Sequence, residues 1–92
     1  MEEATIVCTE YMKYRLCLRG YDLATVEQIL RYSSERYVDT VTGRVVAIGR
    51  HEKLLVMIPY ELKERILMPI TIHATSRQQI NSRIKSGRFK NE

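Results

Sequence analysis

The stretch from Thr9 to Asp22 most constrains the fold, because it predicts two consecutive helices separated by a short break. Thr9 can cap a first helix over residues 10–19, and Gly20 can end that helix in the left-handed conformation. Asp22 can then cap a second helix over residues 23–33. The second helix carries an apolar stripe at helical spacing, formed by Leu23, Val26, Ile29 and Leu30. This stripe predicts that the second helix packs on a core.

The middle of the chain predicts β-structure. Residues 36–41 and 44–50 flank Thr42-Gly43, which is suited to a tight hairpin turn. A shorter β-prone run at residues 4–8 predicts an edge strand.

Two prolines divide the next part of the chain. A strand is expected over residues 53–58, and Pro59 is expected to interrupt it, so that residues 60–65 form a loop or a short turn of helix. Residues 66–73 predict a further strand. Because proline cannot donate to a strand ladder, Pro69 must lie at an edge or a bulge.

The end of the chain predicts a third helix. The run from Thr75 to Gln78 has the pattern of a capping box and opens a helix over residues 76–86. Residues 88–92 are expected to fray. The order of elements predicts a single α+β domain over residues 1–92, with two N-terminal helices, an antiparallel sheet of three to four strands and a C-terminal helix.

Composition agrees with a globular chain. Of 92 residues, 45% are apolar and 28% are charged, which is typical of soluble domains. The acidic start from Met1 to Ala4 lacks the features of a signal peptide, and the longest apolar run, Leu54 to Pro59, is too short to cross a membrane. We therefore expect a cytoplasmic protein without a membrane partner.

The sequence carries no known metal or cofactor motif. Cys8 and Cys17 lie in apolar surroundings without the spacing of metal ligands, which predicts reduced cysteines in the core. We find no zinc pattern, phosphate-binding glycine loop or nucleophile elbow, and therefore expect neither a metal ion nor a cofactor. His51 lies at a predicted turn beside Glu52 and is expected to be exposed.

The positive charge of the chain is carried mainly by arginine. The net charge is +4, with ten arginines against five lysines. Arginine forms forked contacts with phosphates and bases, so this bias favours an anionic partner, although the same charge also serves solubility. Tyr11, Arg15 and Arg19 recur every four residues and form one row on the first helix. The row suits contact with phosphates or bases, and equally a solvated helix face.

His73 is the better of the two histidines for chemistry. It ends a predicted strand just before a helix N-terminus, where free N–H groups attract anions, and Arg77 lies in the first turn of that helix. These groups can bind a phosphate and transfer a proton, as RNA cleavage without a metal requires. The alternative is a histidine that hydrogen-bonds a backbone carbonyl.

Two further groups have both a structural and a functional interpretation. Arg44 and Arg50 stand at the two ends of one strand face, which is either an RNA-binding groove or a core face whose arginines reach outward. In the last helix only Ile80 and Ile84 are apolar. So narrow a stripe predicts either a peripheral helix or burial against a partner chain, with Phe89 in the contact.

One spacing joins the first two helices: an arginine, a second arginine four residues later, a glycine and an apolar residue. These are Arg15, Arg19, Gly20 and Tyr21. Together with the run His73-Ala74-Thr75, the layout resembles small bacterial and archaeal proteins of the BrnT-like and related DUF4258-type families. Those families carry a histidine-alanine pair where Tyr11 and Met12 stand here, and BrnT-like chains commonly have serine-alanine-arginine at the second run.

The resemblance implies a relative of the RelE toxin fold and a ribonuclease toxin of a type II toxin–antitoxin pair, neutralised by a small antitoxin protein. It implies metal-independent RNA cleavage with His73 in proton transfer. Arg15, Arg19 and Arg77 would hold phosphate, and Tyr11 would stack or donate. An alternative is a non-catalytic interaction or regulatory module of the same fold, acting as a homodimer or with a small protein partner. DNA binding through the last helix is a third interpretation.

Overall fold

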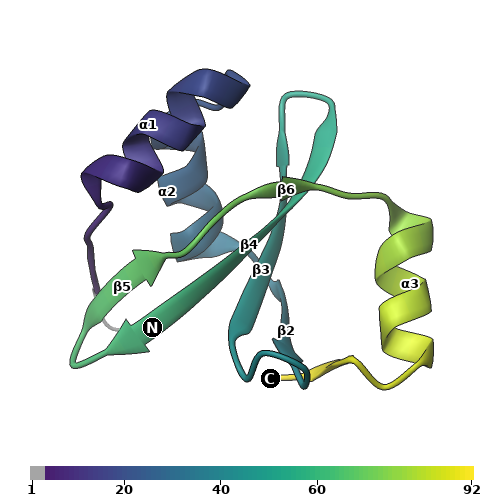
Figure 1. The fold of residues 1–92 in the computed structure, drawn as a ribbon. Helices are drawn as coiled ribbons and strands as arrows, with labels where there is room; N and C mark the ends of the chain where they lie inside the picture. Colours follow the sequence, from purple (N-terminus) through teal and green to yellow (C-terminus); the bar gives the residue numbers. More distant parts are fainter. Residues whose placement is uncertain (1–3) are drawn as a thin grey trace.

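A computed structural model describes residues 4–92, so Met1 to Glu3 of the acidic start lie outside the described residues. Within this range the chain forms three helices and seven strands, which confirms the predicted α+β class (Figure 1). The elements in chain order are β1 (Thr5–Ile6), α1 (Glu10–Arg19), α2 (Leu23–Tyr32), β2 (Glu35–Asp39), β3 (Val45–His51), β4 (Leu54–Lys63), β5 (Ile66–Pro69), β6 (His73–Ala74), α3 (Arg77–Lys85) and β7 (Phe89–Asn91).

The strands form one mixed sheet with the order β1-β5-β4-β3-β2-β7, and β6 pairs with β4 beyond the end of β5. β1 is parallel to β5, and the other pairs are antiparallel. The predicted sheet of three to four antiparallel strands is therefore too small, and it lacks the parallel pair. β1 is the edge strand predicted within residues 4–8. β6 and β7 have only two and three residues, too few for a periodic sequence signal.

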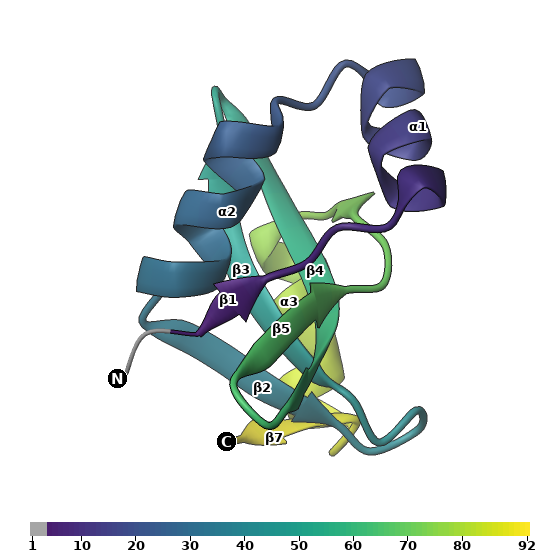
Figure 2. The ribbon, with the colours of Figure 1, turned by 90° about the vertical axis from the view of Figure 1, so that its left-hand side faces the viewer.

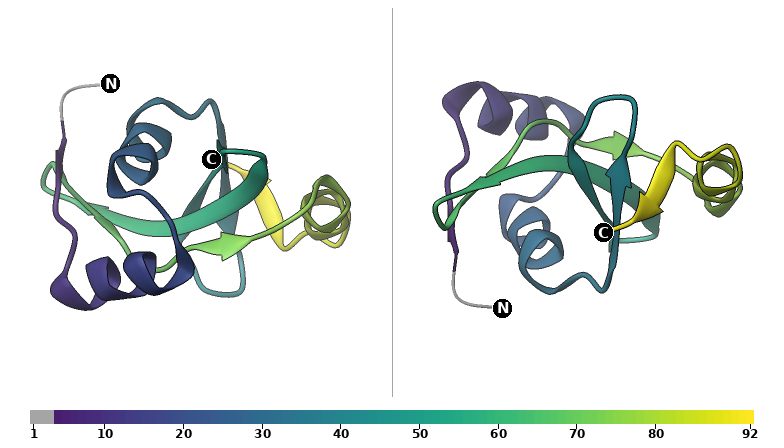
Figure 3. Two further views of the ribbon diagram at one scale, coloured as in Figure 1. Left: turned by 90° about the horizontal axis from the view of Figure 1, so that it is seen from above. Right: turned by 90° about the horizontal axis from the view of Figure 1, so that it is seen from below.

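Helices cover both faces of the sheet. α1 and α2 lie on one face and α3 lies on the other (Figure 2, Figure 3). The core beneath α1 and α2 includes Met12, Leu16, Val26, Leu30, Ala47, Val56, Ile58 and Leu67. The smaller core beneath α3 consists of Val46, Ile48, Leu55, Ile80 and Phe89. Successive residues of β3 and β4 alternate between the two cores, as the pleat of a strand requires.

The two N-terminal helices begin and end as the sequence predicts. The Thr9 hydroxyl accepts a hydrogen bond from the N–H of Met12 (3.1 Å), and Gly20 ends α1 with a left-handed φ of 74°. Asp22 precedes α2, but its carboxylate accepts from the Thr25 hydroxyl and not from a backbone N–H of the first turn. These local contacts fix the break between the helices.

β4 continues through Pro59, where the sequence predicts an interruption and a loop over residues 60–65. In an antiparallel strand, the N–H and C=O of one residue point to the same side. The carbonyl of Pro59 accepts from the N–H of Ile70 (2.8 Å), so the proline nitrogen faces the same segment. Residues 70–72 form no regular strand, and the missing N–H therefore interrupts no ladder there.

The segment predicted as one strand over residues 66–73 forms β5 and β6 with an irregular link between them. The sequence predicts Pro69 at an edge or a bulge. It is the last residue of β5 and lies beyond the two residues of β5 that pair with β1. Ser76, and not Thr75, caps α3, because its hydroxyl accepts from the N–H of Gln79 (3.1 Å).

The C-terminal tail forms β7 instead of fraying. Gly87, with a φ of 82°, reverses the chain after α3, and Phe89–Asn91 then pairs with β2. Phe89 is buried, and its ring stacks on Tyr37 at a centroid distance of 5.4 Å. The tail therefore closes the core beneath α3.

Two expectations about burial are wrong. His51 is buried: its Nε2 accepts from the backbone N–H of Asp22 (2.7 Å), and its ring packs edge-on against Tyr21. Cys17 is exposed, because it lies outside the buried face of α1, whereas Cys8 is half-buried against the core.

Gly49 of β3 marks the closest approach between the sheet and α2. A Cβ added there would lie 2.6 Å from Cγ1 of Ile29. We expect Gly49→Ala to lower the free energy of unfolding by about 1–3 kcal/mol, because the core must shift to admit a methyl group. Urea denaturation measures the effect. In an Ile29→Ala background the same substitution should cost much less, and equal costs in both backgrounds would contradict this packing.

Candidate functional site

Some of the predicted residues meet at β6, which forms an edge of the sheet. β6 pairs with β4, with His73 opposite Met57, which places the His73 side chain on the face covered by α3. Arg15 and Arg19 come from α1 on the other face, and Arg83 comes from α3. The positive charges of all three act on His73. The edge thus gathers one imidazole and three guanidiniums from three elements.

The environment of His73 favours a neutral imidazole. Partial loss of hydration lowers the pKa of His73, and the charges of Arg19, Arg15 and Arg83 lower it further, although the residue is exposed. Within residues 4–92 the imidazole has no hydrogen-bond partner, so the structural alternative of a bond to a backbone carbonyl is not realised. A neutral, unpaired histidine can accept a proton at neutral pH.

Contacts within and beside α1 orient its two arginines. Arg15 donates a hydrogen bond from Nη1 to the hydroxyl of Tyr11 (2.9 Å), and its guanidinium lies 5.6 Å from the centre of the tyrosine ring. Arg19 donates from Nη1 to the carbonyl of Ile72 (2.7 Å), the residue before His73. Of the row predicted on this helix, Arg19 is therefore tied to the β6 edge, whereas Tyr11 and Arg15 bond to each other on the exposed side of α1.

The arginines of the chain fall into two groups. Several hold the fold together: Arg31 donates to the carbonyl of Ala4, Arg36 to the carbonyls of Leu30 and Ser33 and to the hydroxyl of Tyr60, and Arg88 to Asp39. By contrast, none of the described carboxylates forms an ion pair with the guanidinium of Arg15, Arg19 or Arg83. Within residues 4–92, therefore, no ion pair compensates the positive charge of these three arginines.

Arg77 belongs to the structural group. Its guanidinium forms two hydrogen bonds to the carboxylate of Glu35 (2.6 and 3.0 Å), which also accepts from the hydroxyl of Tyr37. The bond from Arg77 is the largest of the effects that lower the pKa of Glu35. This pairing joins α3 to β2, and Arg77 is not among the arginines that act on His73.

Arg44 and Arg50, predicted as one RNA-binding face, are separated in the structure. Arg44 lines a pocket on the α3 face together with His73 and Arg83. Arg50 is exposed near the far end of β3, beside an open groove against α2. Only Arg44 therefore lies with the β6 edge.

The predicted partner contacts are mostly internal. Ile80 and Phe89 are buried in the core beneath α3, and only Ile84 is exposed. Sequence reasoning did not select Arg83, which the structure brings to His73. The available signal was its spacing, because a residue three positions after Ile80 shares the inward face of the helix.

Within residues 4–92, no three His, Cys, Asp or Glu side chains gather as a metal site would require. In the same range, no helix has both the length and the apolar character needed to cross a membrane.

Comparison with protein-family models, with curated proteins and with solved structures finds no match to this chain. The function is therefore inferred from the geometry of the site.

Proposed function

We propose that the protein binds RNA at the β6 edge and cleaves it beside His73, as the toxin of a type II toxin–antitoxin pair. One observation carries the proposal: His73 shares a pocket with Arg83 and follows the residue that Arg19 holds, and no described carboxylate forms an ion pair with either arginine. RNA supplies the matching groups, a 2′-hydroxyl that must lose a proton and a phosphate that gains negative charge in the transition state.

In this mechanism, the imidazole of His73 accepts the proton of the 2′-hydroxyl. The freed oxygen attacks the adjacent phosphorus, the bond from phosphorus to the 5′-oxygen breaks, and the products are a 2′,3′-cyclic phosphate and a 5′-hydroxyl. Arg15 and Arg19 stabilise the negative charge of the pentavalent intermediate, and Arg83 adds to the positive charge that attracts RNA. Tyr11 accepts a hydrogen bond from Arg15, so its own O–H stays available to donate to the leaving oxygen.

The pH dependence of cleavage tests the electrostatic part of this mechanism. A base must be unprotonated, so the rate should fall only as the pH drops below the lowered pKa of His73, which is below about 6.5. Arg19→Gln removes one positive charge but keeps a hydrogen-bond donor for Ile72. Removing a nearby positive charge raises the pKa of His73, so the acid limb of the pH–rate profile should move to higher pH. An unmoved limb would contradict the assignment of His73 as the base.

The toxin role is tested by induced expression with growth followed over time. We expect growth arrest with the wild type and recovery with a double variant, Arg15→Gln with Arg19→Gln. Arg77→Gln is the matched control and should still arrest growth, because Arg77 is committed to Glu35. Normal growth with the wild type, or arrest by all three proteins, would oppose the proposal. A short reading frame beside this one that encodes a DNA-binding antitoxin would support it.

A second candidate function is a non-catalytic interaction module, which acts either as a homodimer or with a small protein partner. The exposed face of α1 favours this function. Tyr11, Tyr14 and Leu18 follow helical spacing and are 64%, 61% and 67% exposed. Such a face is suited to burial against another chain. Sedimentation should then show a dimer that Leu18→Lys dissociates, and a monomer at all concentrations would exclude the homodimer.

A further inference from the structure

A small pocket on the α3 face lies directly beside the proposed catalytic residue. Its volume is about 170 Å³. The polar lining includes His73, Arg44 and Arg83, and the apolar lining includes Met57 and Phe89. Pockets for drug-sized ligands are larger, about 300–1,000 Å³. This pocket can therefore admit a small anionic group but not a whole nucleotide.

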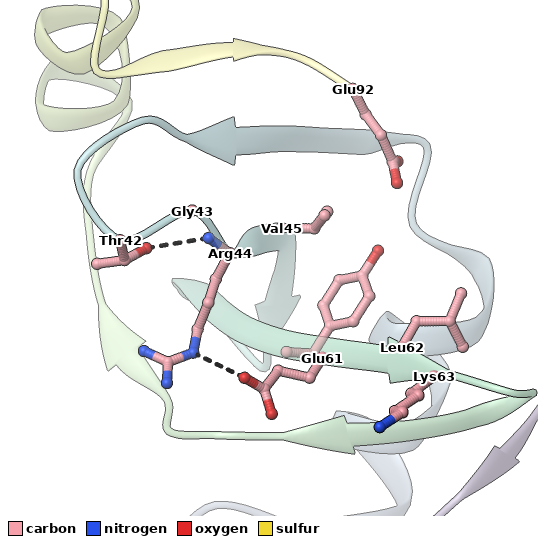
Figure 4. Close-up of a pocket in the computed structure, with 9 residues that line it drawn as sticks. Thr42, Gly43, Arg44, Val45, Glu61, Leu62, Lys63 and Glu92 are labelled. Atoms are coloured by element: carbon pink, nitrogen blue, oxygen red, sulfur yellow. Dashed lines mark hydrogen bonds and ion pairs between the residues drawn. The ribbon is translucent and has the colours of Figure 1, made fainter.

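Two donors in the lining lack acceptors. Nε of Arg44 and Nη1 of Arg83 are buried, and neither has a hydrogen-bond partner within residues 4–92. Nε of Arg44 lies 3.5 Å from a carboxylate oxygen of Glu61, an ion pair without hydrogen-bond geometry. Figure 4 shows this pair in a neighbouring pocket that Arg44 also lines. A buried donor without an acceptor is costly, by about 1–3 kcal/mol. Glu61 balances the charge of the Arg44 nitrogen, so the Arg83 nitrogen is the donor that indicates a ligand with an acceptor.

An aromatic ring holds the guanidinium of Arg83, and a turn holds the backbone of Arg44. The Arg83 guanidinium lies 5.6 Å from the centre of the Phe89 ring, in cation–π contact. Arg44 follows a turn in which the Thr42 hydroxyl accepts from the backbone N–H of Arg44 (3.2 Å), as Figure 4 shows. Donors that are fixed before the ligand arrives lose little freedom on binding.

The charge of the pocket is positive. Three arginines line it, at positions 44, 83 and 88, against the single carboxylate of Asp39. Asp39 is committed to Arg88 through two hydrogen bonds of 3.1 Å. Glu61, which lies outside the lining, pairs with Arg44 at 3.5 Å, and none of the described carboxylates pairs with Arg83. A guanidinium N–H is well matched to a phosphate oxygen.

We propose that this pocket binds a phosphate group, with Arg44 and Arg83 as its donors. Where the phosphate belongs to RNA, the inference rests on the proposed function and assigns the pocket to the phosphate next to the one that reacts at His73. A terminal phosphate monoester and an internal diester present the same oxygens, and experiment can separate the two.

The test is an NMR titration of the ¹⁵N-labelled chain with inorganic phosphate. We expect shifts of the backbone amides around Arg44, Arg83 and Phe89 that saturate as for a single site.

Arg83→Gln and Arg44→Gln should each weaken phosphate binding by about tenfold or more, as expected for losing a charge-assisted hydrogen bond. Arg50→Gln, which removes an exposed arginine outside the pocket, should bind as the wild type does. Because Arg83→Gln also loses contact with Phe89, Arg83→Lys serves as a second variant that keeps the charge and should bind more tightly than Arg83→Gln.

Equal weakening by Arg50→Gln, or unchanged binding in both pocket variants, would overturn the inference. Two 2′-O-methyl RNA oligonucleotides, with and without a 5′-phosphate, separate the sources. If the wild type binds the 5′-phosphorylated oligonucleotide more tightly and Arg83→Gln does not, the pocket binds a terminal monoester. If the wild type binds both oligonucleotides equally and Arg83→Gln weakens both, the pocket binds an internal phosphate of the RNA. Phosphate binding without RNA cleavage would contradict the proposed ribonuclease function but support the phosphate pocket. RNA cleavage that the pocket variants do not affect would support the ribonuclease function but contradict the pocket.

Discussion

Replacing His73 by glutamine is expected to lower the rate of RNA cleavage by about 10²–10⁴-fold, the usual contribution of a general base. Glutamine keeps a polar side chain of similar reach but cannot accept the proton of the 2′-hydroxyl. Since Arg15, Arg19 and Arg83 remain, RNA binding should be nearly unchanged. Single-turnover cleavage of a short labelled RNA gives the rate, and fluorescence anisotropy with a 2′-O-methyl analogue gives the affinity.

The separation of rate from affinity is what identifies a base. A variant that lost both in the same proportion would assign His73 to RNA binding. A variant as active as the wild type would remove it from the mechanism. Arg77→Gln is the control for non-specific damage to the fold. It removes the ion pair between α3 and Glu35 without changing the charges around His73.

Replacing Asp39 by alanine is expected to lower the free energy of unfolding by about 2–4 kcal/mol. The Asp39 side chain is only 8% exposed and accepts two hydrogen bonds from Arg88. It also accepts from the backbone N–H of Val41 (2.9 Å). Its loss would release both the turn between β2 and β3 and the tail that leads into β7. Urea denaturation measures the change.

The carboxylate of Asp39 also makes the stability of the fold depend on pH. Burial by itself would raise the pKa of Asp39, but the hydrogen bonds from Arg88 and from the backbone of the turn outweigh it and hold the pKa below its ordinary value. The stabilisation is therefore present above about pH 3.9, the value for an unfolded chain, and is lost as the pH falls through the lower folded pKa. Asp39→Asn, which cannot ionise, should flatten this part of the stability–pH curve. An identical curve for both proteins would contradict the account.

The sequence predicted those parts of the fold that are determined locally. α1, its Thr9 cap and the Gly20 end depend on contacts between residues close in the chain. The stripe of α2 is a periodic signal, and three of its four members, Val26, Ile29 and Leu30, are buried. The α+β class followed from the order of such elements.

What the sequence could not predict depends on neighbours distant in the chain. Pro59 lies inside β4 because an irregular segment faces its nitrogen, and no pattern near Pro59 reports that. β7 has three residues and exists because β2 offers an edge. His51 is buried because the break before α2 presents the N–H of Asp22 to it.

The site was predictable only in part for the same reason. The row of Arg15 and Arg19 is visible as a helical spacing, and His73 as a strand end before a cap. Which arginine of α3 serves His73 depends on the orientation of that helix on the sheet. Arg77 binds Glu35, which lies 42 positions earlier in the chain, whereas Arg83 lies near the β6 edge.

The most direct test of the proposed function is incubation of the purified chain with a mixed-sequence RNA in the presence of EDTA, followed by analysis of the product ends. We expect cleavage that EDTA does not prevent, with 2′,3′-cyclic phosphate and 5′-hydroxyl ends, and its loss in His73→Gln. RNA that stays intact with the wild type, or cleavage that His73→Gln leaves unchanged, would contradict the assignment of the β6 edge as a ribonuclease site.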